Sequence, residues 1–408
     1  METVTIMPEG SAAPRARWFG EEEYLDRRRR VRAEMQERNL GSLVVVDPAN
    51  MHYLSGYDGW SFYVPQALVL GVEEDSLPYW IGRPQDTNGA RITTELDDEH
   101  IRCYPESYVQ SRDRHPMDAL ADLVRELGSG SGRVGVEMDA YYFSAAAWER
   151  LRAGLPRADL TDSSLLVNWC RFVKSDTELE LMRLAARLTD RAMATAVDAV
   201  TPGARECDAA ARIVAAQYEG IDGVPGDYPA IVPLIPSRER TSTAHLTWVD
   251  RRYEPGDVVN LELSGCIRRY HAPLARTLVL GDPPPALERL AEVVAEGVEA
   301  ALGAVRPGAT CADVEAAWRA VLARNGYRKD SRLGYSVGVG YPPDWGEHTA
   351  SFRRDDDTVL VPGAAFHMIA GMWMDDHGFE LSETVVVGAR GVEVLTRYPR
   401  RLLVNGRG

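Results

Sequence analysis

Apolar and polar positions predict that helices and strands alternate over the first part of the chain. Residues 21–40 predict a helix, because Tyr24, Leu25, Val31 and Met35 recur on one side of a charged remainder. Short β-branched runs predict strands at 42–46 and 68–72, and residues 118–127 predict a second helix. The Gly-Ser stretch at 128–132 predicts a turn before a strand at 134–136. This alternation indicates an α/β domain.

A second domain is expected to begin near residue 173. Ser175 followed by Glu178 is a capping-box pattern, and it precedes a long amphipathic run that predicts a helix. The chain of 408 residues also exceeds the usual length of one domain, roughly 100–200 residues. We therefore predict one domain over residues 1–172 and another over 173–408.

The second domain contains an internal repeat. The turn sequence Pro-Gly-Ala at 202–204 recurs at 307–309, each time with an aspartate four residues after the alanine, and each time between two predicted helices. Self-similarity of this kind predicts two related halves packed about a pseudo-twofold axis, with a site at their junction.

Composition and charge limit the classes of partner. The net charge of −15 argues against nucleic acid and favours solubility. No apolar run approaches the ~18–20 residues of a membrane helix, and the N-terminus lacks a signal-peptide pattern, so a cytoplasmic protein without a membrane partner is expected. The basic run Arg27–Arg30 lies among acidic residues, which predicts a solvated helix face.

Two neighbouring motifs then identify the second domain. GDVVNLE at 256–262 and HAPLART at 271–277 resemble the paired metal-binding motifs of the creatinase and aminopeptidase P family, whose fold is known as pita-bread. In that family two aspartates at these motifs bridge a pair of divalent ions. Here Glu262 stands at the first ligand position and Pro273 at the second.

The remaining ligand positions are altered as well. The resemblance aligns the family's metal histidine with Tyr335 and its two metal glutamates with Ile369 and Ser382, although Glu383 follows directly. Divalent transition metals need several oxygen or imidazole donors around one point, and proline and isoleucine supply none. We therefore expect a site without a metal ion and without any other cofactor.

The resemblance also implies an architecture. It predicts an α/β N-terminal domain followed by an α+β pita-bread catalytic domain with an internal pseudo-twofold repeat, assembled as a homodimer. It places His245, ahead of the GDVV motif, at the family's active-site histidine. A histidine there suits proton transfer to or from water.

The catalytic role is expected to fall on Glu262, His245 and Tyr335. Glu262 lies among apolar strand positions, where a carboxylate is costly unless it is paired or used. A salt bridge to Arg276 on the next strand is one explanation. The other, which we favour, is that Glu262 binds or attacks a cationic carbon of a substrate.

Other side chains are expected to contact the substrate. Trp60 and Tyr63 lie in a predicted loop rich in aromatic residues, and Trp373 lies near the former ligand positions. Such rings hold flat cations by cation–π attraction. Glu383 and Glu347 are the acidic candidates, and a substrate carboxylate would meet one of Arg83, Arg268 and Arg332, which the sequence does not rank.

The altered ligand positions indicate a class of substrate that needs no metal ion. A peptide carbonyl needs a Lewis acid, whereas an amidinium or guanidinium carbon already has positive charge and needs carboxylates and a base. The stretches 53–66, 80–90, 262–277, 334–348 and 370–385 resemble a branch of the family that opens the ring of a zwitterionic cyclic amidine. The alternatives are a creatinase-like amidinohydrolase, a peptidase, and a catalytically dead ligand-binding homologue.

Overall fold

The computed structural model describes residues 19–406 and divides into two compact units, one up to Val167 and one from Asn168 onward. The sequence-based boundary between residues 172 and 173 lies close to this division, and helix α6 (Leu166–Arg171) spans it. The first 18 residues, on which the expectation of no signal peptide depends, lie outside the described part.

The N-terminal unit is built on a six-stranded mixed sheet in the order β4-β3-β2-β1-β5-β6. Its core is formed by strand residues such as Val44 and Val134 packed against helix residues such as Leu120 and Leu151. The elements are α1 (Glu21–Glu37), β1 (Ser42–Val45), α2 (Pro48–Ser55), β2 (Ala67–Gly71), β3 (Tyr79–Gly82), α3 (Thr87–Thr93), β4 (Ile101–Cys103), α4 (Pro116–Glu126), β5 (Arg133–Val136), α5 (Ala145–Gly154) and β6 (Asp159–Asp162). The predicted α/β class is confirmed.

The interpretation of the basic run as a solvated face is wrong for two of its four residues. Arg27 and Arg28 are buried. The Arg27 guanidinium lies 3.9 Å from the ring centroid of Phe19 and 4.5 Å from that of Tyr53, and it donates to the Tyr53 carbonyl. Cation–π contacts and backbone carbonyls compensate the lost hydration of this charge.

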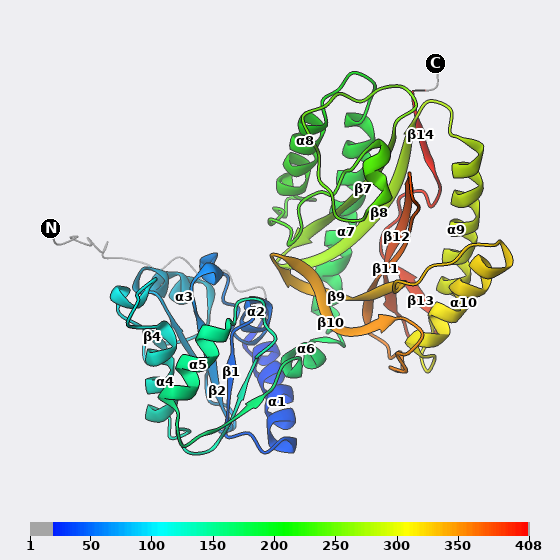
Figure 1. Cartoon of the computed structure of the whole chain (residues 1–408). Coiled ribbons are helices and arrows are strands. Elements are labelled where there is room, and N and C mark those ends of the chain that lie inside the picture. The colour runs from blue at the N-terminus through cyan, green and yellow to red at the C-terminus, as the bar shows by residue number, and fades with distance from the viewer. Residues whose placement is uncertain (1–18, 407–408) are drawn as a thin grey trace. The chain divides into compact units, whose positions relative to one another are not determined.

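The C-terminal unit is a strongly curved sheet covered by two pairs of helices, as Figure 1 shows. Strands β13, β12, β11, β9, β8 and β14 follow one another in the sheet, while β7 pairs with β8 and β10 with β9. The helices are α7 (Asp176–Ala199), α8 (Glu206–Glu219), α9 (Pro285–Ala304) and α10 (Cys311–Arg324). The strands are β7 (Val258–Ile267), β8 (Tyr270–Leu280), β9 (Gly334–Tyr341), β10 (Asp344–Phe352), β11 (Ala365–Trp373), β12 (Gly378–Val387), β13 (Val392–Val394) and β14 (Leu403–Asn405).

The predicted helix start and the internal repeat are both present in this unit. Ser175 is the N-cap of α7 and forms a capping box with Glu178. Each repeated Pro-Gly-Ala turn joins two helices, and Gly203 and Gly308 adopt positive φ angles of 87° and 84°. A left-handed conformation of this kind favours glycine, which explains why the turn recurs with glycine in both halves.

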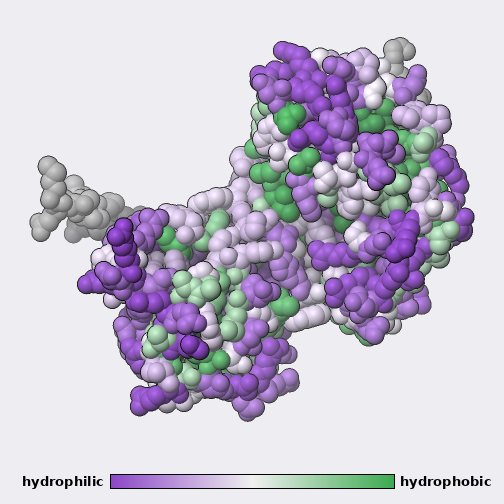
Figure 2. All heavy atoms as spheres, viewed as in Figure 1, coloured by the Kyte–Doolittle hydropathy of each residue, from purple (hydrophilic) through white to green (hydrophobic). Residues whose placement is uncertain are grey.

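Hydrophilic residues predominate on the face shown in Figure 2, interrupted by smaller hydrophobic areas. This distribution agrees with a charged-residue content of 26%. Among the described residues, no helix is long and apolar enough to cross a membrane.

Candidate active site

Strand pairing in the C-terminal unit brings polar side chains together on one face of the curved sheet. Glu262 on β7 is paired with Ala275 on β8, and Asn260 with Thr277. The Ala275 N–H donates to the Ser382 Oγ at 2.6 Å, and the Glu380 N–H donates to the Thr277 Oγ1 at 2.8 Å. Because side chains two residues apart share a face, Glu262, Glu380 and Ser382 belong to one polar cluster.

Glu262 is a buried carboxyl group that forms no ion pair with any residue from 19 to 406. Its side chain is 5% exposed, and no hydrogen bond to its carboxyl oxygens is found within residues 19–406. Burial, followed by the nearby charges of Glu380 and Asp344, raises the pKa of Glu262 well above its usual value. The guanidinium of Arg276, the alternative partner, instead contacts Glu383. A cation bound beside Glu262 would therefore stabilise its charged form and lower its pKa.

Glu380 is the second carboxyl group of this cluster. It accepts a hydrogen bond from the Trp373 Nε1 at 2.8 Å. Burial raises the pKa of Glu380 to about 7, although Trp373, Lys329 and Asn260 act against the rise. The Lys329 Nζ lies 4.5 Å from the centroid of the Trp373 ring and donates to the Gly371 carbonyl at 2.7 Å. Trp373, expected to contact substrate, thus lies against one of the site's carboxyl groups.

Tyr335 lies at the end of a chain of side-chain hydrogen bonds. Its Oη lies 3.0 Å from the Nδ1 of His367, and the Nε2 of His367 lies 2.8 Å from the Ser382 Oγ. The Trp345 Nε1 donates to the same Tyr335 Oη at 2.9 Å. Burial, with a smaller contribution from Arg332, lowers the pKa of His367 to about 3, so its ring is neutral near pH 7.

Two further charged groups border this chain. The Arg332 guanidinium lies 4.4 Å from the centroid of the Tyr335 ring and donates to the Ser351 Oγ at 3.2 Å. The Asp344 carboxylate lies 2.9 Å from the Nε2 of His348. Of the three arginines considered for a substrate carboxylate, Arg332 contacts a predicted catalytic residue of its own unit. Arg83 pairs with Glu106 in the N-terminal unit.

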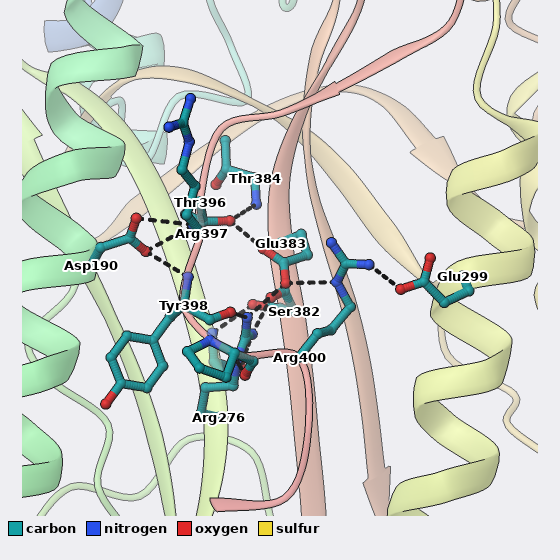
Figure 3. A network of polar contacts seen from close by, with 12 residues as sticks. Asp190, Arg276, Glu299, Ser382, Glu383, Thr384, Thr396, Arg397, Tyr398 and Arg400 are labelled. Atoms are coloured by element: carbon teal, nitrogen blue, oxygen red, sulfur yellow. Dashed lines mark hydrogen bonds and ion pairs between the residues drawn. The ribbon is translucent and has the colours of Figure 1, made fainter.

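The structure places Glu383 in a network of buried ion pairs and hydrogen bonds, shown in Figure 3. Its Oε1 accepts from Arg276 at 2.6 Å and from the Arg400 Nε at 3.0 Å, and its Oε2 accepts from the Thr396 hydroxyl. Arg276 also donates to the carbonyls of Ser382, Tyr398 and Pro399. Both carboxyl oxygens are therefore engaged in joining β12 to β8 and to the segment that follows β13.

Glu347 has a similar environment. It is 1% exposed, and its Oε2 lies 2.6 Å from the Lys174 Nζ while its Oε1 lies 3.6 Å from Arg171. The carboxylate thus has two cations of its own unit as partners.

The other predicted residues lie on loops or exposed surfaces. His245 is exposed in the loop after the short helix Arg238–Ser242, and no hydrogen bond of its ring is found in the described part of the chain. Trp60 and Tyr63 in the N-terminal unit are 56% and 66% exposed, and the Tyr63 hydroxyl accepts from Arg83 at 3.0 Å. Phe62, between them in sequence, is buried.

Sequence analysis missed Glu380, His367 and Asp344. The first two lie close to former ligand positions but not at them: Glu380 is two residues before Ser382, and His367 is two residues before Ile369. Attention to the neighbours of the former ligand positions could have identified both. Asp344 follows the two prolines 342 and 343 and has no comparable signal.

The residues at the family's ligand positions do not fit a pair of divalent ions. Pro273 and Ile369 have no donor atom, and the Tyr335 and Ser382 oxygens are engaged with His367. Across residues 19–406, no group of three or more His, Cys, Asp or Glu side chains is arranged to hold a metal ion. The donor set of this chain therefore differs from that of the metallopeptidases.

Two family models match the chain. The model for metallopeptidase family M24 matches residues 180–389, and the model for the creatinase/prolidase N-terminal domain matches residues 27–173. These matches cover the C-terminal and N-terminal units respectively, so they confirm the family resemblance that the motifs predicted.

Several proteins resemble the chain over most of its length. An uncharacterized hydrolase/peptidase of Sinorhizobium fredii is 46% identical over 95% of this chain and 98% of its own. The ectoine hydrolase of Halomonas elongata is 42% identical over 95% of this chain and 98% of its own. The crystal structure of the prolidase from Pyrococcus horikoshii superimposes with a TM-score of 0.78 at 20% identity, covering 93% of this chain and 100% of that one. The last comparison confirms the predicted pita-bread fold.

Proposed function

Because the chain belongs to metallopeptidase family M24, with a creatinase/prolidase N-terminal domain, and is a hydrolase by this relationship, we propose that it hydrolyses ectoine. In the proposed reaction the cyclic amidine ring opens to N-acetyl-diaminobutyrate without participation of a metal ion. The observation that supports it most directly is the pair of buried carboxyl groups, Glu262 and Glu380, in place of a ligand set.

A planar cation suits this pair of carboxyl groups. Both have raised pKa values, because burial penalises their charged forms, and the charge of Glu380 raises the pKa of Glu262 further. An amidinium between them would supply the missing positive charge and lower both pKa values. Two carboxylates accepting from the two N–H groups of an amidinium also fix its orientation.

The chemistry then requires one water molecule. The water oxygen adds to the amidine carbon, one of the two C–N bonds breaks, and the leaving nitrogen takes up a proton. We assign Glu262 as the group that accepts the water proton and Glu380 as a proton carrier beside it. In the covalent alternative Glu262 adds to the carbon, the C–N bond breaks, and the water molecule then hydrolyses the adduct and releases Glu262. His245, predicted for proton transfer, is the alternative carrier.

The aromatic and basic residues complete the proposal. Trp373 lies against Glu380 and would cover one side of the bound ring. Arg332, stacked on Tyr335, is our choice for the substrate carboxylate. Trp60 and Tyr63 remain predicted substrate contacts because their rings are exposed. Glu383 and Glu347 were predicted substrate contacts; we now propose a structural role for both, since their carboxylates already have cationic partners. A homodimer in the cytoplasm remains our expectation.

The first experiment is a substrate comparison on chelator-treated protein. Ectoine, creatine and a proline dipeptide are incubated separately with the protein, with and without added Mn²⁺, and the products are identified by mass spectrometry. We expect ectoine to be opened at the same rate in both conditions. Creatine cleavage would move the substrate assignment, and a dependence on Mn²⁺ would contradict the metal-free mechanism. Binding of ectoine without turnover would indicate a ligand-binding homologue.

A further inference from the structure

The hydrogen bonds around Tyr335 determine the direction in which its hydroxyl group can act. A phenol oxygen accepts up to two hydrogen bonds and donates one. The Trp345 Nε1–H can only donate, so its 2.9 Å contact occupies one lone pair of the Tyr335 Oη. The His367 Nδ1 lies 3.0 Å from the same oxygen. Whether the Tyr335 hydroxyl accepts a second hydrogen bond there or donates its own hydrogen depends on which nitrogen of His367 bears the hydrogen.

Ser382 decides the tautomer of His367. The Ala275 backbone N–H, which can only donate, contacts the Ser382 Oγ at 2.6 Å. The Ser382 hydroxyl hydrogen can then be donated to the His367 Nε2 at 2.8 Å. If Nε2 bore a hydrogen, this fully buried hydroxyl would receive two donors and its own hydrogen would have no acceptor among the described contacts. Leaving a buried donor unpaired is unfavourable, so Nε2 is the acceptor and Nδ1 bears the hydrogen.

The Tyr335 oxygen consequently receives hydrogen bonds from both Trp345 and His367. Because both lone pairs are used, the hydroxyl hydrogen of Tyr335 is available for donation to another group. The carboxyl cluster is nearby, since burial and then the charge of Glu262 raise the pKa of Tyr335. Tyr335 can thus donate to an oxygen atom but cannot accept from an amidinium N–H. This polarity assigns the nitrogen edge of the substrate to Glu262 and Glu380, and an oxygen atom to Tyr335.

We propose that Trp345, His367 and Ser382 are positioning residues that fix Tyr335 as a one-way hydrogen-bond donor to the oxygen that adds to the amidine carbon. This inference rests on the proposed function for the identity of that oxygen, whereas the direction of the hydrogen bonds does not. No bond to Tyr335 forms or breaks in the step. Its hydroxyl stabilises the charge that develops on the added oxygen, as donors of an oxyanion hole do.

The tautomer is tested without any substrate. Protein labelled with ¹⁵N-histidine is examined by long-range ¹H–¹⁵N correlation near pH 7, and His367 is identified among the eight histidines by its loss in His367→Asn. We expect a protonated Nδ1 and an unprotonated Nε2. His271 is an internal reference, because its Nε2 accepts the Ala230 N–H at 2.9 Å and its Nδ1 must donate to the Arg269 carbonyl. A protonated Nε2 at His367 would overturn the inference even if ectoine is turned over.

The role in the reaction is tested by a matched pair of variants. The side-chain amide nitrogen of asparagine lies near the position of the imidazole Nδ1, and that of glutamine near the position of Nε2. We expect His367→Asn to retain the donor to Tyr335 and to keep kcat about tenfold above that of His367→Gln. Tyr335→Phe should lower kcat about 10²–10³-fold with little change in KM. Equal losses in the two His367 variants, or a loss in Tyr335→Phe confined to KM, would refute the assigned role.

A third variant covers the case in which His367 substitutions prevent folding. Ser382→Ala removes the hydrogen donated to the His367 Nε2, so the ¹⁵N shift of this unprotonated nitrogen should change, while Nδ1 should keep its hydrogen because a hydrogen on Nε2 would have no acceptor. An unchanged spectrum would contradict the relay. If ectoine is not a substrate, only the kinetic arms fail, and the spectrum still decides the direction of the hydrogen bonds.

Discussion

Replacement of Glu383 by glutamine separates a structural role from the substrate contact that the sequence suggested. The carboxylate is 1% exposed, and its partner Arg276 is fully buried. Glutamine keeps the shape but removes the negative charge, so that Arg276 and Arg400 are left without their common counter-ion. Loss of one partner of a buried ion pair costs roughly 3–5 kcal/mol.

The expected thermal effect follows from the size of the C-terminal unit, residues 168–408. For domains of about 150–250 residues, each kcal/mol shifts Tm by roughly 2–4 °C, so Glu383→Gln should lower the Tm of this unit by about 6–20 °C. Calorimetry on the full chain measures this shift, and steady-state kinetics on ectoine at a temperature well below the transition should give an unchanged KM.

The matched control is Glu299→Gln. Glu299 is the second acidic partner of Arg400, but its side chain is 63% exposed, so the loss should not exceed about 1 kcal/mol. If Glu383→Gln melts like the unchanged protein and instead raises KM strongly, the network of Figure 3 does not have the structural role argued for it, and Glu383 belongs to the substrate site.

Four further predictions concern the site. Glu262→Gln should lower turnover about 10²–10⁴-fold with an unchanged circular dichroism spectrum. Glu380→Gln should lower turnover more than His245→Ala does; the reverse order would make His245 the proton carrier. The folded-state pKa of Glu380, about 7, lies above the ordinary glutamate value of 4.5, so its stabilising contribution is fully present below pH 4.5 and is lost as the pH rises to 7, by about 3 kcal/mol. Urea unfolding at several pH values should show this slope, and Glu380→Gln should reduce it; an equal slope in both proteins would contradict the assigned pKa. Trp60→Ala should raise the KM for ectoine about threefold to thirtyfold, the range of one cation–π contact, and an unaltered KM would remove Trp60 from the site.

The sequence predicted the architecture well because its signals are local. The capping box at Ser175 and the repeated turns at Gly203 and Gly308 depend on a few neighbouring residues, and the structure confirms all three. The family resemblance then predicted the pita-bread fold of the unit that contains Glu262, which no local pattern could provide.

The composition of the site was less predictable because it depends on contacts between distant strands. Glu383 and Glu380 are three residues apart on β12, yet one meets Arg276 and the other meets Trp373 and the Glu262 cluster. Which partners each face of β12 meets is evident only once β12 is placed against β8. Similarly, the burial of Arg27 depends on Tyr53, which is 26 residues away in sequence and supplies both a ring and a carbonyl.

The attachment of the segment after β13 has a consequence for synthesis of the protein. Arg276 on β8 needs the carbonyls of Tyr398 and Pro399, and β14 pairs with β8 in parallel, from Leu403 opposite Leu278 to Asn405 opposite Leu280. These residues leave the ribosome more than 100 residues after their partners. Until then, a nascent chain exposes one edge of β8 and an unsatisfied buried guanidinium. A ribosome paused before residue 398 would therefore expose a sheet that lacks its edge strand β14, and a chaperone could bind the open edge of β8.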